Sequence, residues 1–154
     1  MAIDNVKKYF KQYNIENRII ELTTSSATVK EAAESLGTEE CKIAKTLSFL
    51  VEEKPILIVA AGDAKIDNSK YKEFFSTKAK MIPATDVENL IGHNIGGVCP
   101  FAIKENVTVY LDESLKRFET VYPACGSSNS AIELTIEELE KYSNYSKWID
   151  VCKY

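Results

Sequence analysis

The sequence has very few of the side chains that build metal centres and acid–base catalysts. Its 154 residues contain one histidine, His93, and four cysteines, none of which belongs to a CxxC pair. A zinc site needs closely spaced cysteine and histidine ligands, so we expect no metal and no cofactor. The chain is long enough to bury a core without disulfides, and we expect the four cysteines to be reduced thiols.

Long apolar runs are also missing. The longest, Pro55 to Ala61, is far shorter than the roughly 20 residues needed to cross a bilayer. The first residues lack the apolar segment and cleavage site of a signal peptide. We therefore expect a cytoplasmic protein with no membrane contact. Because no repeat, low-complexity tract or Pro/Gly-rich linker divides the chain, residues 1–154 are predicted to form one domain.

The chain has no excess of positive charge. Its net charge of −4 argues against a protein that grips nucleic acid by general electrostatic attraction. The segment from Ala64 to Ile82, however, contains five lysines and only two acidic residues, which makes it a candidate for phosphate contacts. A solvated surface is the simpler interpretation of such a run. The five residues are Lys65, Lys70, Lys72, Lys78 and Lys80.

Helical and strand patterns alternate irregularly along the chain. Thr28-x-x-Glu31 predicts a capped helix that ends before Gly37, Thr38 is expected to cap a further turn through Cys41, and Thr135-x-x-Glu138 predicts the last helix. Two apolar runs joined by Glu52-Glu53-Lys54 predict a central hairpin. The other expected helices are 4–13, 68–75 and 85–91, and the expected strands are 18–22, 43–51, 55–60, 107–111, 120–124, 131–134 and 148–151. This order favours an α/β fold of the mixed, α+β-like kind, with a mostly antiparallel mixed sheet flanked by helices.

Three segments break the pattern of the regular elements around them. Lys45 places a cation inside an apolar run, where an ammonium needs an anion or carbonyl groups unless it reaches solvent. The loop from Gly92 to Phe101 contains paired glycines that would let a backbone N–H approach a ligand, or form an ordinary tight turn. The run from Tyr122 to Ser130 has the small polar composition of a pocket rim or of a plain loop. No GxSxG motif is present, and His93, just after the helix-stopping Gly92, is a weak candidate base, so a serine triad is disfavoured.

Taken in order, these segments resemble the YbaK/EbsC family, the stand-alone relatives of the editing domain of bacterial prolyl-tRNA synthetases. The resemblance rests on Ala44-Lys45-Thr46-Leu47, on Val59 to Asp63, on the GxxxP loop from Gly96 to Pro100 and on the Gly126-Ser127 pair. Any one of these motifs is weak, and the ordered set covers nearly the whole chain.

The resemblance implies a compact mixed α/β domain with a curled sheet that hydrolyses the ester of mischarged aminoacyl-tRNA, with Cys-tRNA(Pro) or Ala-tRNA(Pro) as the expected substrate. It implies that Lys45 holds the terminal nucleotide or the aminoacyl group and that the Gly96 backbone fixes the ester carbonyl. It also implies a pocket formed with Thr46, Gly97, Pro100, Gly126 and Ser127. Family members lack a protein nucleophile and rely on the substrate's own ribose hydroxyl or thiol, together with water. Under this reading the five lysines become candidate tRNA contacts, and prolyl-tRNA synthetase becomes a candidate partner.

Two departures bear on the substrate. Cys99 stands where many relatives have serine before the loop proline, and serine stands near Gly126-Ser127 where the alanine-specific branch has histidine. The pocket therefore resembles the cysteine-clearing branch more closely. The alternative to an enzyme is a catalytically silent module of the same fold that binds a nucleotide or a protein partner.

Overall fold

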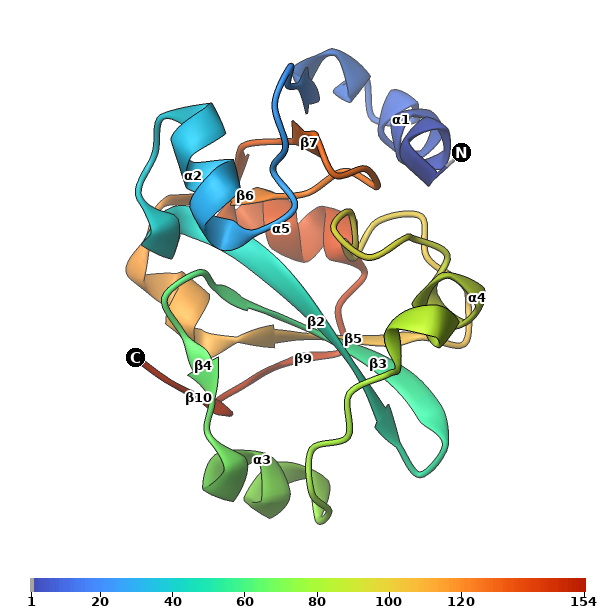
Figure 1. Cartoon of the computed structure of the whole chain (residues 1–154), viewed down its shortest axis with the longest axis vertical. Helices are drawn as coiled ribbons and strands as arrows, with labels where there is room; N and C mark the ends of the chain where they lie inside the picture. The colour runs from blue at the N-terminus through green and yellow to red at the C-terminus, as the bar shows by residue number, and fades with distance from the viewer. Residues whose placement is uncertain (1) are drawn as a thin grey trace.

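The structure is a computed structural model that describes residues 2–154 (Figure 1). Its α-helices are α1 (Ala2–Lys11), α2 (Val29–Leu36), α3 (Asn68–Phe75), α4 (Val87–Ile91) and α5 (Ile136–Ser143). Short 3-10 helices are η1 (Glu16–Arg18), η2 (Glu40–Lys42), η3 (Ala84–Asp86) and η4 (Glu113–Arg117). The strands are β1 (Ile20–Glu21), β2 (Ile43–Val51), β3 (Lys54–Ala61), β4 (Lys65–Ile66), β5 (Thr108–Asp112), β6 (Thr120–Pro123), β7 (Ser130–Ala131), β8 (Leu134–Thr135), β9 (Lys147–Ile149) and β10 (Cys152–Lys153).

The predicted hairpin of β2 and β3 forms the centre of the molecule. The two strands pair antiparallel from Ala44 opposite Ala61 to Val51 opposite Lys54. Glu52 and Glu53 turn the chain with φ values of 50° and 67°, the left-handed conformation that a tight two-residue hairpin requires. Because every residue of β3 after Lys54 is buried, this strand lies in the core with side chains covered on both faces.

Around the hairpin, a six-stranded sheet has the order β8-β6-β2-β3-β5-β9. The pairs β2–β6, β3–β5 and β5–β9 are parallel, and β6–β8 is antiparallel. Two further antiparallel pairs, β1–β7 and β4–β10, lie outside this sheet. Figure 1 shows α1 and α3 at opposite ends of the molecule with the sheet between them. The predicted class, a mixed sheet flanked by helices, is confirmed.

Several helix ends follow the predicted local signals. The Thr28 hydroxyl accepts a hydrogen bond from the Glu31 N–H, and Gly37 ends α2 with φ 70°. Thr135 and Glu138 form a complete capping box at the start of α5. Among residues 2–154, no helix is long and apolar enough to span a membrane.

Three predictions of local structure need correction. η2 is capped by Glu39 without a side-chain hydrogen bond, so Thr38 does not cap this turn. The strand expected at 131–134 is two short strands, because the chain changes partner from β1 to β6 within it. The strand expected at 18–22 is reduced to β1, since the end of η1 occupies its first residue.

Candidate functional site

The outer edge of β2 is open over a short stretch at the middle of the sheet. β6 pairs only with Ile43 and Ala44. Farther along β2, Ile82 donates its N–H to the Ser48 carbonyl, and Leu50 donates its N–H to the Lys80 carbonyl. Among residues 2–154, no strand pairs with this edge between these two contacts. A gap in the sheet is therefore left beside Thr46.

Thr46 directs unpaired polar groups into this gap. Alternate residues of a strand turn their backbone groups to the same edge, and Ser48 and Leu50 turn theirs to the outer edge. Thr46 therefore turns its N–H and C=O outward as well. Its Oγ1 atom is buried and has no hydrogen-bond partner within the described part of the chain. Buried polar groups are normally satisfied, so this stretch is suited to a polar ligand.

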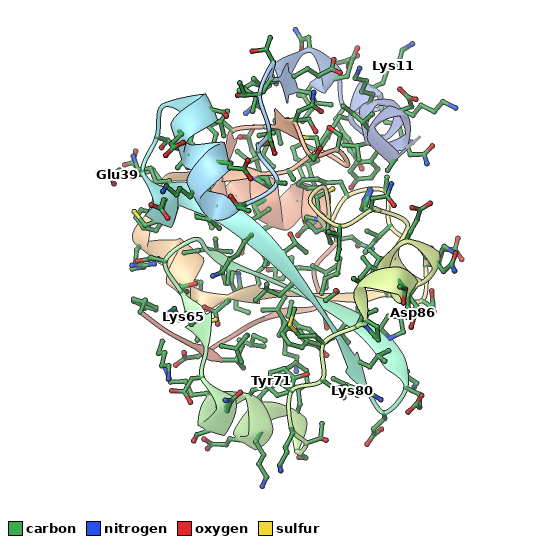
Figure 2. The ribbon with its side chains drawn as sticks, viewed as in Figure 1. Lys11, Glu39, Lys65, Tyr71, Lys80 and Asp86 are labelled. Atoms are coloured by element: carbon green, nitrogen blue, oxygen red, sulfur yellow. The ribbon has the colours of Figure 1, made fainter. Side chains whose placement is uncertain are left out.

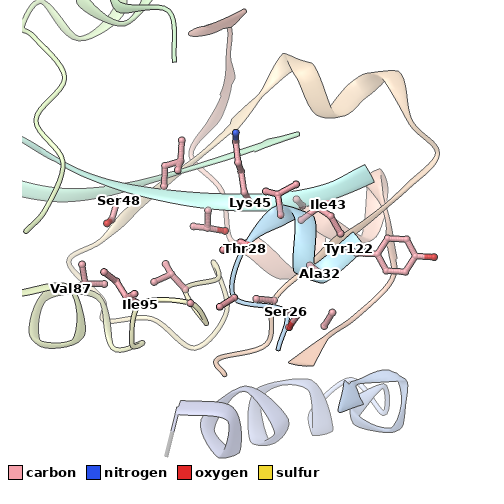
Figure 3. Close-up of a pocket in the computed structure, with 18 of the residues that line it drawn as sticks. Ser26, Thr28, Ala32, Ile43, Lys45, Ser48, Val87, Ile95 and Tyr122 are labelled. Atoms are coloured by element: carbon pink, nitrogen blue, oxygen red, sulfur yellow. The ribbon is translucent and has the colours of Figure 1, made fainter. Parts of the chain in front are cut away.

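A cavity of about 310 Å³ occupies the gap. Its wall is mostly apolar, and its rim includes Met81 and Ile95, whose side chains are 58% and 61% exposed. Figure 3 shows Thr28, Val87 and Ile95 around the space below β2, each from a different segment of the chain. The polar residues of the lining are Ser26, Thr28, Lys45, Thr46, Ser48, Tyr122 and Ser130.

The predicted glycine loop brings Gly96 to the cavity wall. Gly96 has a φ of +92°, a conformation that side chains rarely adopt, and a Cβ at this position would lie 3.2 Å from the Ala27 Cβ. The structure thus places Gly96 and Thr46, both predicted from the sequence, around one cavity. Gly96 itself is half-buried and forms part of the cavity wall.

Gly97, Gly126 and Ser127 support this loop from behind and are not part of the cavity lining. The Gly126 N–H donates to the Gly97 carbonyl at 3.1 Å, and a Cβ on Gly97 would lie 2.5 Å from the Ser127 nitrogen. The Ser127 hydroxyl lies 2.9 Å from the Asn129 Oδ1, to which it donates, and 2.7 Å from the Ser130 hydroxyl. Gly97 and Gly126 are buried, and the Ser127 hydroxyl contacts Ser130, which lines the cavity.

Lys45 lines the cavity, but its ammonium extends to the other side of β2. Figure 3 shows Lys45 and Ser48 leaving the strand on opposite sides. The ammonium donates to the carbonyls of Gly62, at 3.4 Å, and Ala64. Burial lowers the pKa of Lys45 from its usual value. The cation is thus held in the turn between β3 and β4, and the cavity lies across the strand from it.

Pro100 and His93 lie away from this cavity. Pro100 lines a second cavity of about 260 Å³ with Tyr9 and Tyr142. His93 is completely buried, and its Nε2 atom lies 2.6 Å from the Phe101 carbonyl and 3.4 Å from the Cys99 Sγ. Burial lowers the pKa of His93. The sequence made His93 a weak candidate base because it follows Gly92, and these contacts place its ring in the core.

The buried thiols are poor nucleophiles. Cys99 and Cys125 are both fully buried. Burial raises the pKa of Cys99 to about 12 and raises the pKa of Cys125 well above its usual value, so both remain protonated near neutral pH. The described part of the chain contains no group of three histidine, cysteine or acidic residues placed to hold a metal ion.

The five predicted lysines are spread over different surroundings. Lys70 is occupied by Asp150, at 3.1 Å, and by the Cys152 carbonyl. Lys65 lies on β4 and Lys72 on α3, and the exposed Lys78 and Lys80 precede the rim residue Met81. Of the five, Lys70 alone forms an ion pair within residues 2–154.

Sequence reasoning missed several cavity residues. Ser26 to Val29 enter the wall at the start of α2, and Val87, Ile95 and Tyr122 enter it from three other segments. Ile95 and Tyr122 lie within two of the segments that the sequence singled out, whereas Val87 had no signal and the capping signal at Thr28 predicted only the start of a helix. The open edge of β2 that draws them together depends on strand pairing.

Comparisons with known proteins agree on one family. A family model described as the aminoacyl-tRNA editing domain matches residues 23–142. The uncharacterised protein YwhH of Bacillus subtilis (strain 168) is 55% identical over 154 residues, covering 99% of this chain and 98% of its own. EbsC of Enterococcus faecalis (strain ATCC 700802 / V583), described as a candidate Cys-tRNA(Pro)/Cys-tRNA(Cys) deacylase, is 26% identical over 91% of this chain and 88% of its own.

A solved structure has the same fold over nearly the whole chain. The crystal structure of a candidate trans-editing enzyme for prolyl-tRNA synthetase superimposes with a TM-score of 0.87 at 26% identity, covering 99% of this chain and 98% of that one. The proline–tRNA ligase of Limosilactobacillus fermentum is 31% identical over 113 residues, which are 69% of this chain and 20% of the ligase. The match to the ligase therefore concerns one part of a much longer protein.

Proposed function

Because the chain belongs to the aminoacyl-tRNA editing domain family, we propose that it hydrolyses the ester bond of mischarged aminoacyl-tRNA. The EbsC and trans-editing relatives support a deacylase acting on tRNA that carries a wrong amino acid. The expected substrates are Cys-tRNA(Pro) and Ala-tRNA(Pro). Prolyl-tRNA synthetase is the proposed partner that supplies them.

The observation that carries this proposal is the cavity at the open edge of β2. Its wall combines an apolar lining with the outward-facing backbone and unpartnered hydroxyl of Thr46 and with Gly96. An aminoacyl ester has matching chemistry, since a small side chain is apolar while the α-ammonium and the carbonyl are polar. We assign the aminoacyl group to this cavity.

The two sides of β2 are proposed to bind different parts of the substrate. In this proposal the cavity side holds the amino acid, and the Lys45 side receives the terminal nucleotide. The ammonium of Lys45 is anchored by two carbonyls, which fixes a positive charge on the nucleotide side of β2 without an acid partner. A fixed charge of this kind stabilises developing negative charge because it need not reorganise during the reaction.

The reaction proceeds without a protein nucleophile. Cys99 and Cys125 are buried and protonated, His93 is buried away from the cavity, and the Ser127 hydroxyl is hydrogen-bonded to neighbouring side chains. An aminoacyl ester is already activated, so positioning it and stabilising its oxyanion are sufficient. Either water attacks the ester carbonyl with the vicinal ribose hydroxyl as its hydrogen-bonding aid, or the substrate thiol attacks it to form a thiolactone that water then opens. In both routes the ester C–O bond breaks, and the terminal ribose hydroxyl leaves with the proton that the attacking water or thiol gives up. Gly96 provides the backbone N–H that fixes the carbonyl oxygen.

The test is a panel of tRNA(Pro) molecules charged with cysteine, alanine or proline. We expect the purified protein to release cysteine or alanine and to leave proline attached. Thr46→Val keeps the shape of the side chain and removes its hydroxyl, so it should slow hydrolysis while retaining the fold. Failure of the wild-type protein to deacylate any member of a panel widened to other tRNAs would overturn the proposal in favour of a silent binding module.

A further inference from the structure

An exposed aromatic ring lies on a fixed cation beside the turn that holds Lys45. Tyr154 is 66% exposed, and the Arg117 guanidinium lies 3.9 Å from the centre of its ring. Arg117 is held by two hydrogen bonds to the Asp63 carboxylate, at 2.6 and 3.0 Å, and by one to the Ser114 carbonyl, at 2.9 Å. One face of the ring is thus supported on an ordered base, and much of the side chain is open to solvent.

The same turn joins this ring to Lys45. Asp63 stands between Gly62 and Ala64, whose carbonyls accept hydrogen bonds from the Lys45 ammonium. The Arg117–Asp63 pair therefore fixes one side of the turn while Lys45 fixes the other. Gly62 permits this arrangement, because a Cβ there would lie 1.9 Å from the Glu40 carbonyl oxygen.

Two unpaired cations lie directly opposite each other on the neighbouring strands. Lys65 of β4 is the cross-strand partner of Lys153 of β10, and like charges in this position destabilise a strand pair. Within residues 2–154 neither lysine forms an ion pair. Of the nearby acids, Asp63 is engaged by Arg117, and Asp67 accepts from backbone N–H groups of α3 and also interacts electrostatically with Lys153. An anion bound between the two lysines would relieve their repulsion.

We propose that Tyr154, Lys65 and Lys153 form a platform for the unpaired 3′ end of the tRNA acceptor strand. The exposed ring stacks on a base, and the lysine pair binds the adjoining phosphate. An aromatic ring beside clustered cations is the usual arrangement for binding single-stranded nucleic acid. This proposal rests on the proposed function, and it places the terminal nucleotides on the Lys45 side of β2 while the amino acid enters the cavity across the strand.

The first experiment measures binding of a 5′-labelled, uncharged acceptor-stem microhelix by fluorescence anisotropy. One RNA has the complete unpaired 3′ end, and a second lacks its unpaired nucleotides. Tyr154→Leu should raise the Kd for the complete RNA by about tenfold, the size expected from loss of one stacked base. Tyr154→Phe keeps the ring and should bind as the wild type does. Neither substitution should change the Kd for the shortened RNA.

The second experiment tests the lysine pair by its salt dependence. Replacing Lys65 and Lys153 together with glutamine should reduce the slope of log Kd against log salt by about one to two. Lys11→Gln is the matched control, because Figure 2 shows Lys11 at the far end of the molecule from Lys65. An unchanged slope in the double variant, or equal effects of Tyr154→Leu on both RNAs, would overturn the platform.

These measurements separate the platform from the proposed function. If the wild-type protein deacylates mischarged tRNA and Tyr154→Leu binds the complete RNA normally, the platform is wrong and the enzyme assignment stands. If Tyr154→Leu loses binding while the wild-type protein deacylates nothing, the platform stands and the enzyme assignment is wrong.

Discussion

Lys45 combines an apolar stem in a largely buried strand with an ammonium group that is held by carbonyls. Its stem crosses the apolar surface of β2, and its ammonium ends at the carbonyls of Gly62 and Ala64. Transfer of an unpaired ammonium out of water is costly, which is why burial lowers its pKa. The presence of a cation in an apolar run was visible in the sequence. Its carbonyl partners, 17 and 19 residues along the chain, became visible only in the fold.

The first prediction concerns the charge of Lys45. Lys45→Met keeps an apolar stem of similar shape and removes the ammonium. We expect kcat/KM for mischarged tRNA to fall by about a hundredfold or more, the effect typical of losing one fixed electrostatic contact to the transition state. Lys42→Met, in the neighbouring η2, is the control. Single-turnover deacylation and a melting curve measure the two effects, and a folded Lys45→Met protein with normal turnover would disprove the role.

His93 has a structural role in the fold. Its ring is completely buried against Phe101 and Cys99, and the Nδ1 atom has no hydrogen-bond partner among the described residues. The sequence placed His93 correctly after the helix that ends at Gly92. It could not show that the ring turns inward, because that orientation depends on the path of the following loop.

The second prediction is that His93 affects stability and its pH dependence more than catalysis. Burial lowers the pKa of His93 in the fold, so the unfolded chain binds the proton more readily. The free energy of unfolding should therefore decrease as the pH falls below the unfolded pKa of 6.5. His93→Leu should flatten that decrease and leave kcat nearly unchanged. Urea unfolding at several pH values between 5 and 8 measures the slope. A hundredfold loss of kcat in a folded variant would instead identify His93 as a catalytic base.

At the scale of elements, local signals predicted helices better than short strands. The capping residues Thr28 and Thr135 act within one turn, and both make the hydrogen bonds that their motifs predict. Strands need partners from distant parts of the chain, so the run from Ala131 to Leu134 could not be divided into β7 and β8 from its composition. The edge of β2 beside Thr46 has no partner strand in the described part of the chain, and no sequence pattern predicts that.

The third prediction tests the start of α5. Glu138 completes the capping box and also pairs with Arg18 at 2.6 Å. The hydrogen bond from Arg18, followed by those from Thr135, lowers the pKa of Glu138 from 4.5 to about 2. This stabilisation is complete above pH 4.5 and is lost as the pH falls toward 2, where the folded protein must also take up the proton.

Glu138→Gln should therefore lower the free energy of unfolding at neutral pH by about 1 kcal/mol, since both groups are partly exposed and solvent screens the pair. It should also flatten the acid dependence between pH 4.5 and 2. Glu137→Gln, an exposed residue of the same helical turn, is the matched control. Equal denaturation curves for the two variants across this pH range would contradict the prediction.

At the scale of the whole molecule, the cavity is assembled from four separate stretches of chain. Residues 26–32, 43–48, 81–98 and 122–131 contribute to its wall. The family resemblance named Thr46 and Gly96, and both lie in the cavity wall. They also identified Gly97, Gly126 and Ser127, which the fold uses to hold the Gly96 loop. A motif therefore marks the residues that a site needs, without separating those that contact the ligand from those that support them.

Of the five lysines predicted to contact tRNA, Lys78 and Lys80 stand nearest along the chain to the cavity wall. Lys70 is neutralised by Asp150. Lys78 and Lys80 are exposed, and they precede Met81 and Ile82 of the cavity wall. The Lys80 carbonyl accepts a hydrogen bond from the Leu50 N–H of β2. Their position at the rim is fixed by the sheet, and we expect them to contact phosphates of the acceptor stem.

The fourth prediction is that reversing both charges in Lys78→Glu/Lys80→Glu raises KM for mischarged tRNA and reduces its salt dependence. Each phosphate contact contributes about one to the slope of log affinity against log salt, so two contacts should reduce the slope by about two. Hydrolysis of a minimal aminoacyl nucleoside should be unchanged, because it has no acceptor stem. Lys72→Glu on α3 is the control, since this exposed lysine does not adjoin the rim. Equal salt slopes for the wild type and the double variant would show that Lys78 and Lys80 face only solvent, and the stem would then have to be held by another surface or by the synthetase.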